Sequence, residues 1–212
     1  MPQARLSRRG WALFALAGLL ALAVSAYAAR YVIVGPDAFA PNLRDSFLKT
    51  MPGIYIHAGF GAVALATGFI QLNPAIRARS YKLHRWLGRI YATAALAAGT
   101  AGLFLAPFAG AGPIAQTGFG LLAVATILTT AIGWLRIRAR QIEAHRRWMV
   151  RSYALILAAV TLRIELPLLV MTFGEFDPAY RIVAWACWVP NLLVAEWWLR
   201  RSPALIAGEA LA

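Results

Sequence analysis

Charged residues and cysteine are scarce in this sequence. Only 14% of the 212 residues are charged and 61% are hydrophobic, whereas about a quarter of a soluble protein is charged. This balance excludes an ordinary soluble domain. The single cysteine, Cys187, excludes an intrachain disulfide and a cysteine-rich metal or iron–sulfur site. No Walker loop, dinucleotide-binding glycine motif or nucleophile elbow occurs either. We therefore predict no catalytic residue, which favours a protein that is not an enzyme.

Long apolar runs are what the sequence has in abundance. Each of six runs is long enough to cross a hydrocarbon core of about 30 Å as a helix. They cover residues 11–34, 53–73, 86–108, 114–135, 148–173 and 180–199. We therefore predict an all-α, polytopic membrane protein with six transmembrane helices, in which residues 1–212 form a single integral membrane domain. Little chain remains outside these runs, so any chemistry must lie in or at the bilayer.

Basic residues greatly outnumber acidic ones, and the net charge is +13. In a soluble chain this excess would suggest nucleic acid, but here the cations lie between apolar runs, where they contact lipid headgroups. We predict membrane lipids as partners and no nucleic acid. Most of the lysines and arginines lie in the second and fourth connections and near the two termini. The positive-inside rule then places both termini in the cytoplasm of a bacterium, with the protein crossing its inner membrane several times.

An internal repeat suggests how the helices are arranged. The stretch beginning at His57 matches the stretch beginning at Gln116, and His84-Arg85 recurs as His145-Arg146 at nearly the same offset. We interpret predicted helices 2–3 and 4–5 as parallel repeats that form a four-helix core around a pseudo-two-fold axis along the membrane normal. This axis would place His84 and His145 diagonally across the core at its cytoplasmic end. His57 and Gln116 would form the corresponding pair at the outer end.

The histidines at the cytoplasmic end support a haem hypothesis. One imidazole from each of two facing helices can supply both axial ligands of a haem b, so His84 and His145 are candidate ligands of the haem iron. Arginines hold propionates well, and four lie nearby in the sequence: Arg85, Arg89, Arg146 and Arg151. The alternative is that both histidines belong to interfacial His-Arg pairs that bind phospholipid. Small residues at helical spacing from them either allow close helix packing or leave room for a flat macrocycle.

A polar interior in the outer half of the membrane is the second candidate site. His57 and Gln116 could hydrogen-bond to each other, bind a quinone or another small molecule, or be satisfied between helices. Ionisable residues inside a span are functional candidates by default, and the fifth span contains Arg163 and Glu165. We expect Arg163 to face the core on the same stripe as His145 and to bind a polar partner or an anion. Glu165 should approach His57. The alternative is a structural polar network.

Two further residues predict local features, a helix kink and an ion pair. Pro167 predicts a kink in the fifth span, because proline cannot donate its backbone hydrogen bond. Glu196 is followed by Arg200 and Arg201 at the end of the sixth span, which predicts an ion pair at the membrane surface.

A combination of motifs over about residues 50–200 resembles one protein family. The motifs are His57-x3-Gly61, Gln71, Arg77, His84-Arg85-x2-Gly88-Arg89-x-Tyr91, His145-Arg146-x-Trp148-Met149-x-Arg151-Ser152-Tyr153-Ala154 and Thr161-Leu162-Arg163. The combination resembles the predicted membrane proteins of the domain of unknown function 2306 family. More distantly, the plan is similar to cytochrome b-561, where helices 2–5 of six hold two haems between diagonal helices. That similarity implies one haem at His84 and His145, while Gln116 departs from the second ligand pair.

Three functions remain open at this point. The first is an electron-transfer protein with one haem b near the cytoplasmic face and a quinone or another redox partner. The second is a transporter or small-molecule-binding protein that uses His57, Arg163 and Glu165. The third is an accessory or assembly subunit without a cofactor.

Overall fold

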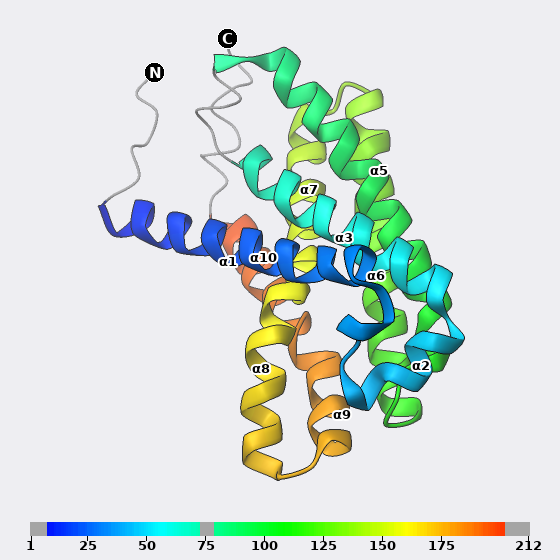
Figure 1. Cartoon of the computed structure of the whole chain (residues 1–212). Coiled ribbons are helices and arrows are strands. Elements are labelled where there is room, and N and C mark those ends of the chain that lie inside the picture. The colour runs from blue at the N-terminus through cyan, green and yellow to red at the C-terminus, as the bar shows by residue number, and fades with distance from the viewer. Residues whose placement is uncertain (1–7, 73–78, 202–212) are drawn as a thin grey trace.

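A computed structural model describes residues 8–72 and 79–201 of the chain (Figure 1). Among these residues all regular structure is helical, and six segments are long and apolar enough to cross a membrane. The segments are Phe14–Ile33, Met51–Gln71, Tyr81–Phe108, Pro113–Arg138, Ile142–Phe173 and Phe176–Arg201. The predicted all-α fold with six transmembrane helices is confirmed.

The first four spans are single helices, and the last two are each made of two. The single ones are α1 (Arg8–Ile33), α3 (Met51–Leu72), α5 (Tyr81–Leu105, continued by the 3-10 turn η3, Ala106–Phe108) and α6 (Pro113–Arg138). The divided ones are α7 (Ile142–Ile156) with α8 (Ala158–Phe173), and α9 (Phe176–Ala186) with α10 (Val189–Arg201). The sequence did not predict the short helices between α1 and α3, which are η1 (Gly35–Ala38), η2 (Pro41–Leu43) and α2 (Arg44–Lys49).

The helices extend beyond the apolar runs because their ends carry good start and stop residues. Ser80 caps α5 by accepting a hydrogen bond from the backbone N–H of Leu83 at 3.2 Å. Gly174 ends α8 with a φ of +73°, a left-handed conformation that suits glycine. Arginines that the sequence placed in connections are therefore helical, among them Arg136 and Arg138 in the last turn of α6.

Four of the spanning helices pack in a closed ring. Helix α3 packs along α5, α5 against α6, α6 along α7, and α7 returns to α3. Helices α5 and α7 therefore occupy opposite corners of the ring. Outside it, α1 packs on α3, while α8 and α9 form a hairpin at the lower edge of Figure 1. Each predicted repeat unit thus forms a packed helix pair, and the two-fold relation between the pairs stays a prediction.

A buried tyrosine pair joins all four helices of the ring. The Tyr91 hydroxyl of α5 lies 2.7 Å from Ser152 Oγ of α7, which lies 2.7 Å from Thr130 Oγ1 of α6. The Tyr153 hydroxyl of α7 donates to the Leu65 carbonyl of α3 at 3.1 Å. The two tyrosine ring centroids are 6.2 Å apart. Every hydroxyl in this cluster has a partner, so the cluster is a structural network that fixes the four helices.

The interruptions of the fifth and sixth spans are connected to each other. They lie at Leu157 and around Cys187. Asn191 Nδ2 donates to Thr161 Oγ1 at 2.9 Å and to the Cys187 carbonyl at 3.0 Å, and the Thr161 hydroxyl donates to the Leu157 carbonyl at 3.1 Å. A side chain thus hydrogen-bonds to a backbone carbonyl at each break, although the Leu157 carbonyl also accepts from the backbone N–H groups of Val160 and Thr161. Helix α8 continues through Pro167, and the break in the span lies at Leu157. The kink predicted at Pro167 stays a prediction.

Candidate functional site

His57 lies on α3 and faces α5. Its Nδ1 donates to the Ala98 carbonyl at 3.0 Å. Gly102, on the same face of α5, makes room for the ring, since a Cβ built there would lie 3.2 Å from Nδ1. The other ring nitrogen, Nε2, has no hydrogen-bond partner within residues 8–72 and 79–201, and the side chain keeps exposed surface. His57 is therefore oriented by α5 and has one nitrogen left to accept a hydrogen bond.

Arg163 and Arg30 approach the same aromatic ring from different helices. The Arg163 Cζ of α8 lies 5.3 Å from the centroid of the Tyr27 ring, and the Arg30 Cζ lies 4.2 Å from it. Arg163 Nη1 donates to the Ala159 carbonyl at 2.9 Å, and Arg30 Nη2 donates to the Ala38 carbonyl at 3.0 Å. The ring face attracts both cations, which ties α8 to α1.

Neither of these arginines has a carboxylate partner in the described part of the chain. Arg163 Nε is also buried without a hydrogen bond. The Tyr27 ring thus brings Arg163 of α8 near Arg30 of α1. Arg30 is exposed in the last turn of α1, so the cost of an unpaired charge falls mainly on half-buried Arg163. A charged side chain costs about 2.5–3.5 kcal/mol near the bilayer centre. An anion between α1, α3 and α8 would offset that cost.

The remaining predicted residues of the polar interior lie elsewhere. Gln116 Nε2 donates to the Ala109 carbonyl at 3.4 Å and has no contact with His57. Glu165 acts on the Cys187 thiol instead of approaching His57, and its Oε2 is buried without a hydrogen-bond partner. Arg163 lies over Tyr27 of α1, whereas His145 bonds to Gly133 of α6, so the two side chains have different helix neighbours. None of the four residues has a hydrogen bond or an ion pair with another of them in the described part of the chain.

The two histidines at the cation-rich end each lie against a neighbouring helix. His145 Nδ1 of α7 donates to the Gly133 carbonyl of α6 at 2.8 Å. The His84 carbonyl of α5 accepts a hydrogen bond from Gln71 Nε2 of α3 at 2.6 Å, and the His84 ring centroid is 6.4 Å from that of Tyr81. The described contacts thus join these histidines to helices next to their own in the ring.

The arginines predicted to hold propionates have other neighbours. Arg151 forms a bidentate ion pair with Glu196 of α10, through Nε to Oε1 and through Nη2 to Oε2, and its Cζ lies 4.8 Å from the Trp148 ring centroid. The sequence predicted that Glu196 pairs with Arg200 or Arg201. In the structure its ion-pair partner is Arg151, because α10 packs on α7. Arg146 lies close enough to His145 for its charge to act on that ring.

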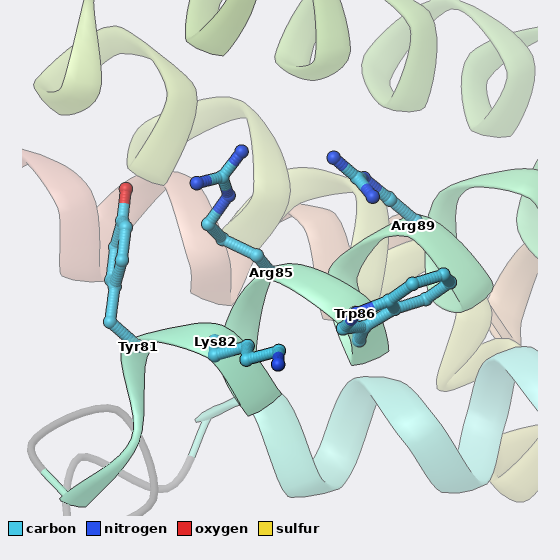
Figure 2. Close-up of a pocket in the computed structure, with 5 residues that line it drawn as sticks. All are labelled: Tyr81, Lys82, Arg85, Trp86 and Arg89. Atoms are coloured by element: carbon cyan, nitrogen blue, oxygen red, sulfur yellow. The ribbon is translucent and has the colours of Figure 1, made fainter.

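Arg85 and Arg89 line a surface groove along the first turns of α5. The groove has a volume of about 360 Å³. Figure 2 shows its five lining residues, which are Tyr81, Lys82, Arg85, Trp86 and Arg89. His84 and His145 do not line it.

This arrangement does not fit a bis-histidine haem. Gly88, one turn from His84, packs against the Gln71 side chain, since a Cβ there would lie 3.3 Å from Gln71 Nε2. Arg151 is neutralised by Glu196, and the two α5 arginines face the groove. His145 shares with His57 one feature of a metal ligand, because donation from Nδ1 to a carbonyl leaves Nε2 free to bind. The described residues also contain no cluster of three or more metal-ligating side chains. Haem binding stays a prediction, and the geometry does not favour it.

The six apolar helical spans define a polytopic α-helical membrane protein. The chain belongs to the DUF2306 family, described as predicted membrane proteins, whose family model matches residues 54–199. No curated protein and no solved structure matches the chain. The similarity to cytochrome b-561 therefore stays a prediction. The family match includes Arg163. It begins after Tyr27 and Arg30, which lie on α1.

Sequence reasoning missed Tyr27 and Arg30 as parts of a site. The signal was present, because Tyr27, Arg30 and Tyr31 are spaced so that they share one face of a helix. The sequence analysis assigned Arg30 no role in a site. Its meeting with Arg163 depends on how α1 crosses α8, which the local sequence does not specify.

Proposed function

We propose that this protein binds a small anionic solute, with a carboxylate or phosphate group, between α1, α3 and α8. The observation that carries the proposal is that Arg30 and Arg163 lie over one tyrosine ring and lack a carboxylate partner among the described residues. Burying a charge without a counter-charge is costly. A bound anion would offset that cost at half-buried Arg163, and exposed Arg30 would serve as a second donor.

The donors around Tyr27 suit such a solute. A guanidinium is planar and presents paired N–H groups that match a carboxylate or phosphate. Arg163 already uses Nη1 on the Ala159 carbonyl, so the unpartnered Nε remains to donate to an anion. His57 Nε2 can accept from a hydroxyl on the same solute, because Nδ1 carries the proton given to the Ala98 carbonyl. Monohydrogen phosphate and hydroxy acids carry both groups.

A site within the membrane spans favours transport or binding over catalysis. Arg163 lies in a span that is interrupted at Leu157. In many transporters a discontinuous helix lies next to the solute site, because a break lets one half of the helix move relative to the other. We further propose that the cation-rich connections face the cytoplasm of a bacterial cell and that the Arg163 region lies towards the outer surface.

The proposal is tested by equilibrium binding with defined anions. The protein is purified in a neutral detergent and dialysed against labelled phosphate, lactate and succinate. We expect saturable binding of at least one of them to the wild type and its loss in Arg163→Leu. Arg201→Leu is the matched control, because Arg201 Cζ lies 4.5 Å from the Trp197 ring centroid and the same charge is removed. No saturable binding to the wild type, or equal binding by Arg163→Leu, would contradict the proposal.

A further inference from the structure

The groove on α5 is a cationic and aromatic surface separate from the Arg163 region. Its residues recur at helical spacing, so that Tyr81, Arg85 and Arg89 follow one another along one face of the helix. Figure 2 shows these three side chains extending to the same side of α5, with Lys82 and Trp86 beside them. The groove thus combines three cations with two aromatic rings and has no acidic residue in its lining.

The aromatic rings hold the two guanidiniums in place. Arg85 Cζ lies 5.9 Å from the Tyr81 ring centroid, and Arg89 Cζ lies 5.3 Å from the Trp86 ring centroid. Stacking on a ring leaves the N–H edges of a guanidinium available for a ligand. Neither arginine has an ion-pair partner among the described residues. The groove therefore offers two positioned donors for phosphate.

The position of the groove in the fold points to a lipid. Helix α5 begins at Tyr81, so the groove lies where an apolar span meets the membrane surface. The Tyr81 and Trp86 side chains are 62% and 56% exposed. Exposed aromatic residues with cations at the end of a span are typical of the headgroup region of a bilayer. Exposed Ile90, in the next turn of α5, continues the surface towards the apolar region.

We propose that this groove binds the headgroup phosphate of an anionic phospholipid. Arg85 and Arg89 contact the phosphate, Lys82 adds charge, and the acyl chains lie along the apolar surface beyond Trp86. The predicted repeat suggests one such site per chain. The positions on α7 that correspond to Lys82, Trp86 and Arg89 are Glu143, Trp148 and Arg151. An acid in place of a cation, and the pairing of Arg151 with Glu196, make the second position a poor phosphate site.

Lipid retention measured by native mass spectrometry tests this proposal. The detergent-purified protein is titrated with phosphatidylglycerol or phosphatidylcholine, and the lipid-bound fractions are compared. We expect the wild type to prefer phosphatidylglycerol. Arg85→Gln/Arg89→Gln should reduce that preference about tenfold or more, because each cation near an anionic surface contributes substantially to binding. Arg85→Lys/Arg89→Lys, which keeps the charge, should lose less.

The matched control removes the same charge elsewhere. Arg138→Gln/Arg140→Gln alters two exposed cations outside the groove, and we expect it to keep the preference. An equal loss in the control would show that net charge, and not the groove, attracts the lipid, which overturns the proposal. An unchanged preference in Arg85→Gln/Arg89→Gln would also overturn it. Displacement of the lipid by millimolar inorganic phosphate would assign the groove to free phosphate instead. If the glutamine variant does not fold, the Trp86→Leu variant should lose the preference.

Discussion

Arg30 and Arg163 are far apart in the sequence and lie over the same tyrosine ring, with Cζ atoms 4.2 and 5.3 Å from the centroid of Tyr27. Two like charges share this ring, and no described carboxylate neutralises them. The cost of this arrangement is the basis for an anionic ligand. The same contact ties α1, which packs mainly on α3, to the α8–α9 hairpin.

A close helix approach in the core, at Gly68, should be sensitive to one methyl group. A Cβ on Gly68 would lie 2.4 Å from Tyr153 Cδ2 and 2.6 Å from Tyr91 Cε2. Gly68→Ala should therefore lower the free energy of unfolding by about 1–3 kcal/mol, the usual cost of overpacking. Thermal unfolding in detergent measures it. Gly61→Ala on the same helix meets nothing within 4 Å, so it should be neutral or stabilising. Equal stability of the two variants would contradict the packing described here.

The hydrogen-bonded link between the two helix breaks can be measured as a coupling energy. Asn191 and Thr161 share a hydrogen bond of 2.9 Å, and each also satisfies a carbonyl at one break. A double-mutant cycle with Asn191→Leu and Thr161→Val should give a coupling of about 0.6–1.7 kcal/mol, the range found for hydrogen bonds between membrane helices. Strict additivity of the two changes would show that the breaks are independent of each other.

An optical spectrum decides the haem hypothesis. Because Arg151 is paired with Glu196 and the small residues of α5 are packed, we expect protein from haem-replete cells to show no Soret band. A red protein with a sharp reduced α band would contradict this expectation. In that case His84→Ala and His145→Ala should each abolish the low-spin spectrum, while His57→Ala should leave it intact.

Reporter fusions test the orientation in the membrane. Arg140 follows α6 at the cation-rich end, and Glu175 lies at the turn between α8 and α9. We expect a fusion at Arg140 to be cytoplasmic and a fusion at Glu175 to be periplasmic. Fusions that place both residues on the same side would contradict the assignment of Ile142–Phe173 as a segment that crosses the membrane.

The number of spans was predictable because it depends on the length and apolarity of each run, which are local properties. The break at Leu157 was not, since no proline or glycine lies at it. The break at Cys187 comes just before Pro190, whose missing backbone N–H was a signal that the sequence analysis did not use. Asn191 and Thr161 meet from the two different spans. Pro167, the strongest local breaker in the fifth span, lies within a continuous helix.

The candidate site was predictable only in part. Arg163 and His57 stood out because polar residues inside apolar spans are rare. Their aromatic neighbour Tyr27 was missed, because a tyrosine in an apolar helix carries no distinctive signal. The arginines near His84 and His145 were correctly grouped along the sequence, but side-chain direction separates them. The Arg151 side chain forms an ion pair with Glu196, and the Arg89 guanidinium lies over the Trp86 ring.

The unfolding temperature of Arg163→Leu, with and without anion, tests the central claim most directly. In anion-free buffer the variant should be as stable as the wild type or more so, because leucine removes an uncompensated buried charge. Adding phosphate, lactate or succinate should raise the unfolding temperature of the wild type and leave that of the variant unchanged. A variant that responds to the anion as strongly as the wild type, or a wild type that responds to none of the three, would contradict an anion site at Arg163.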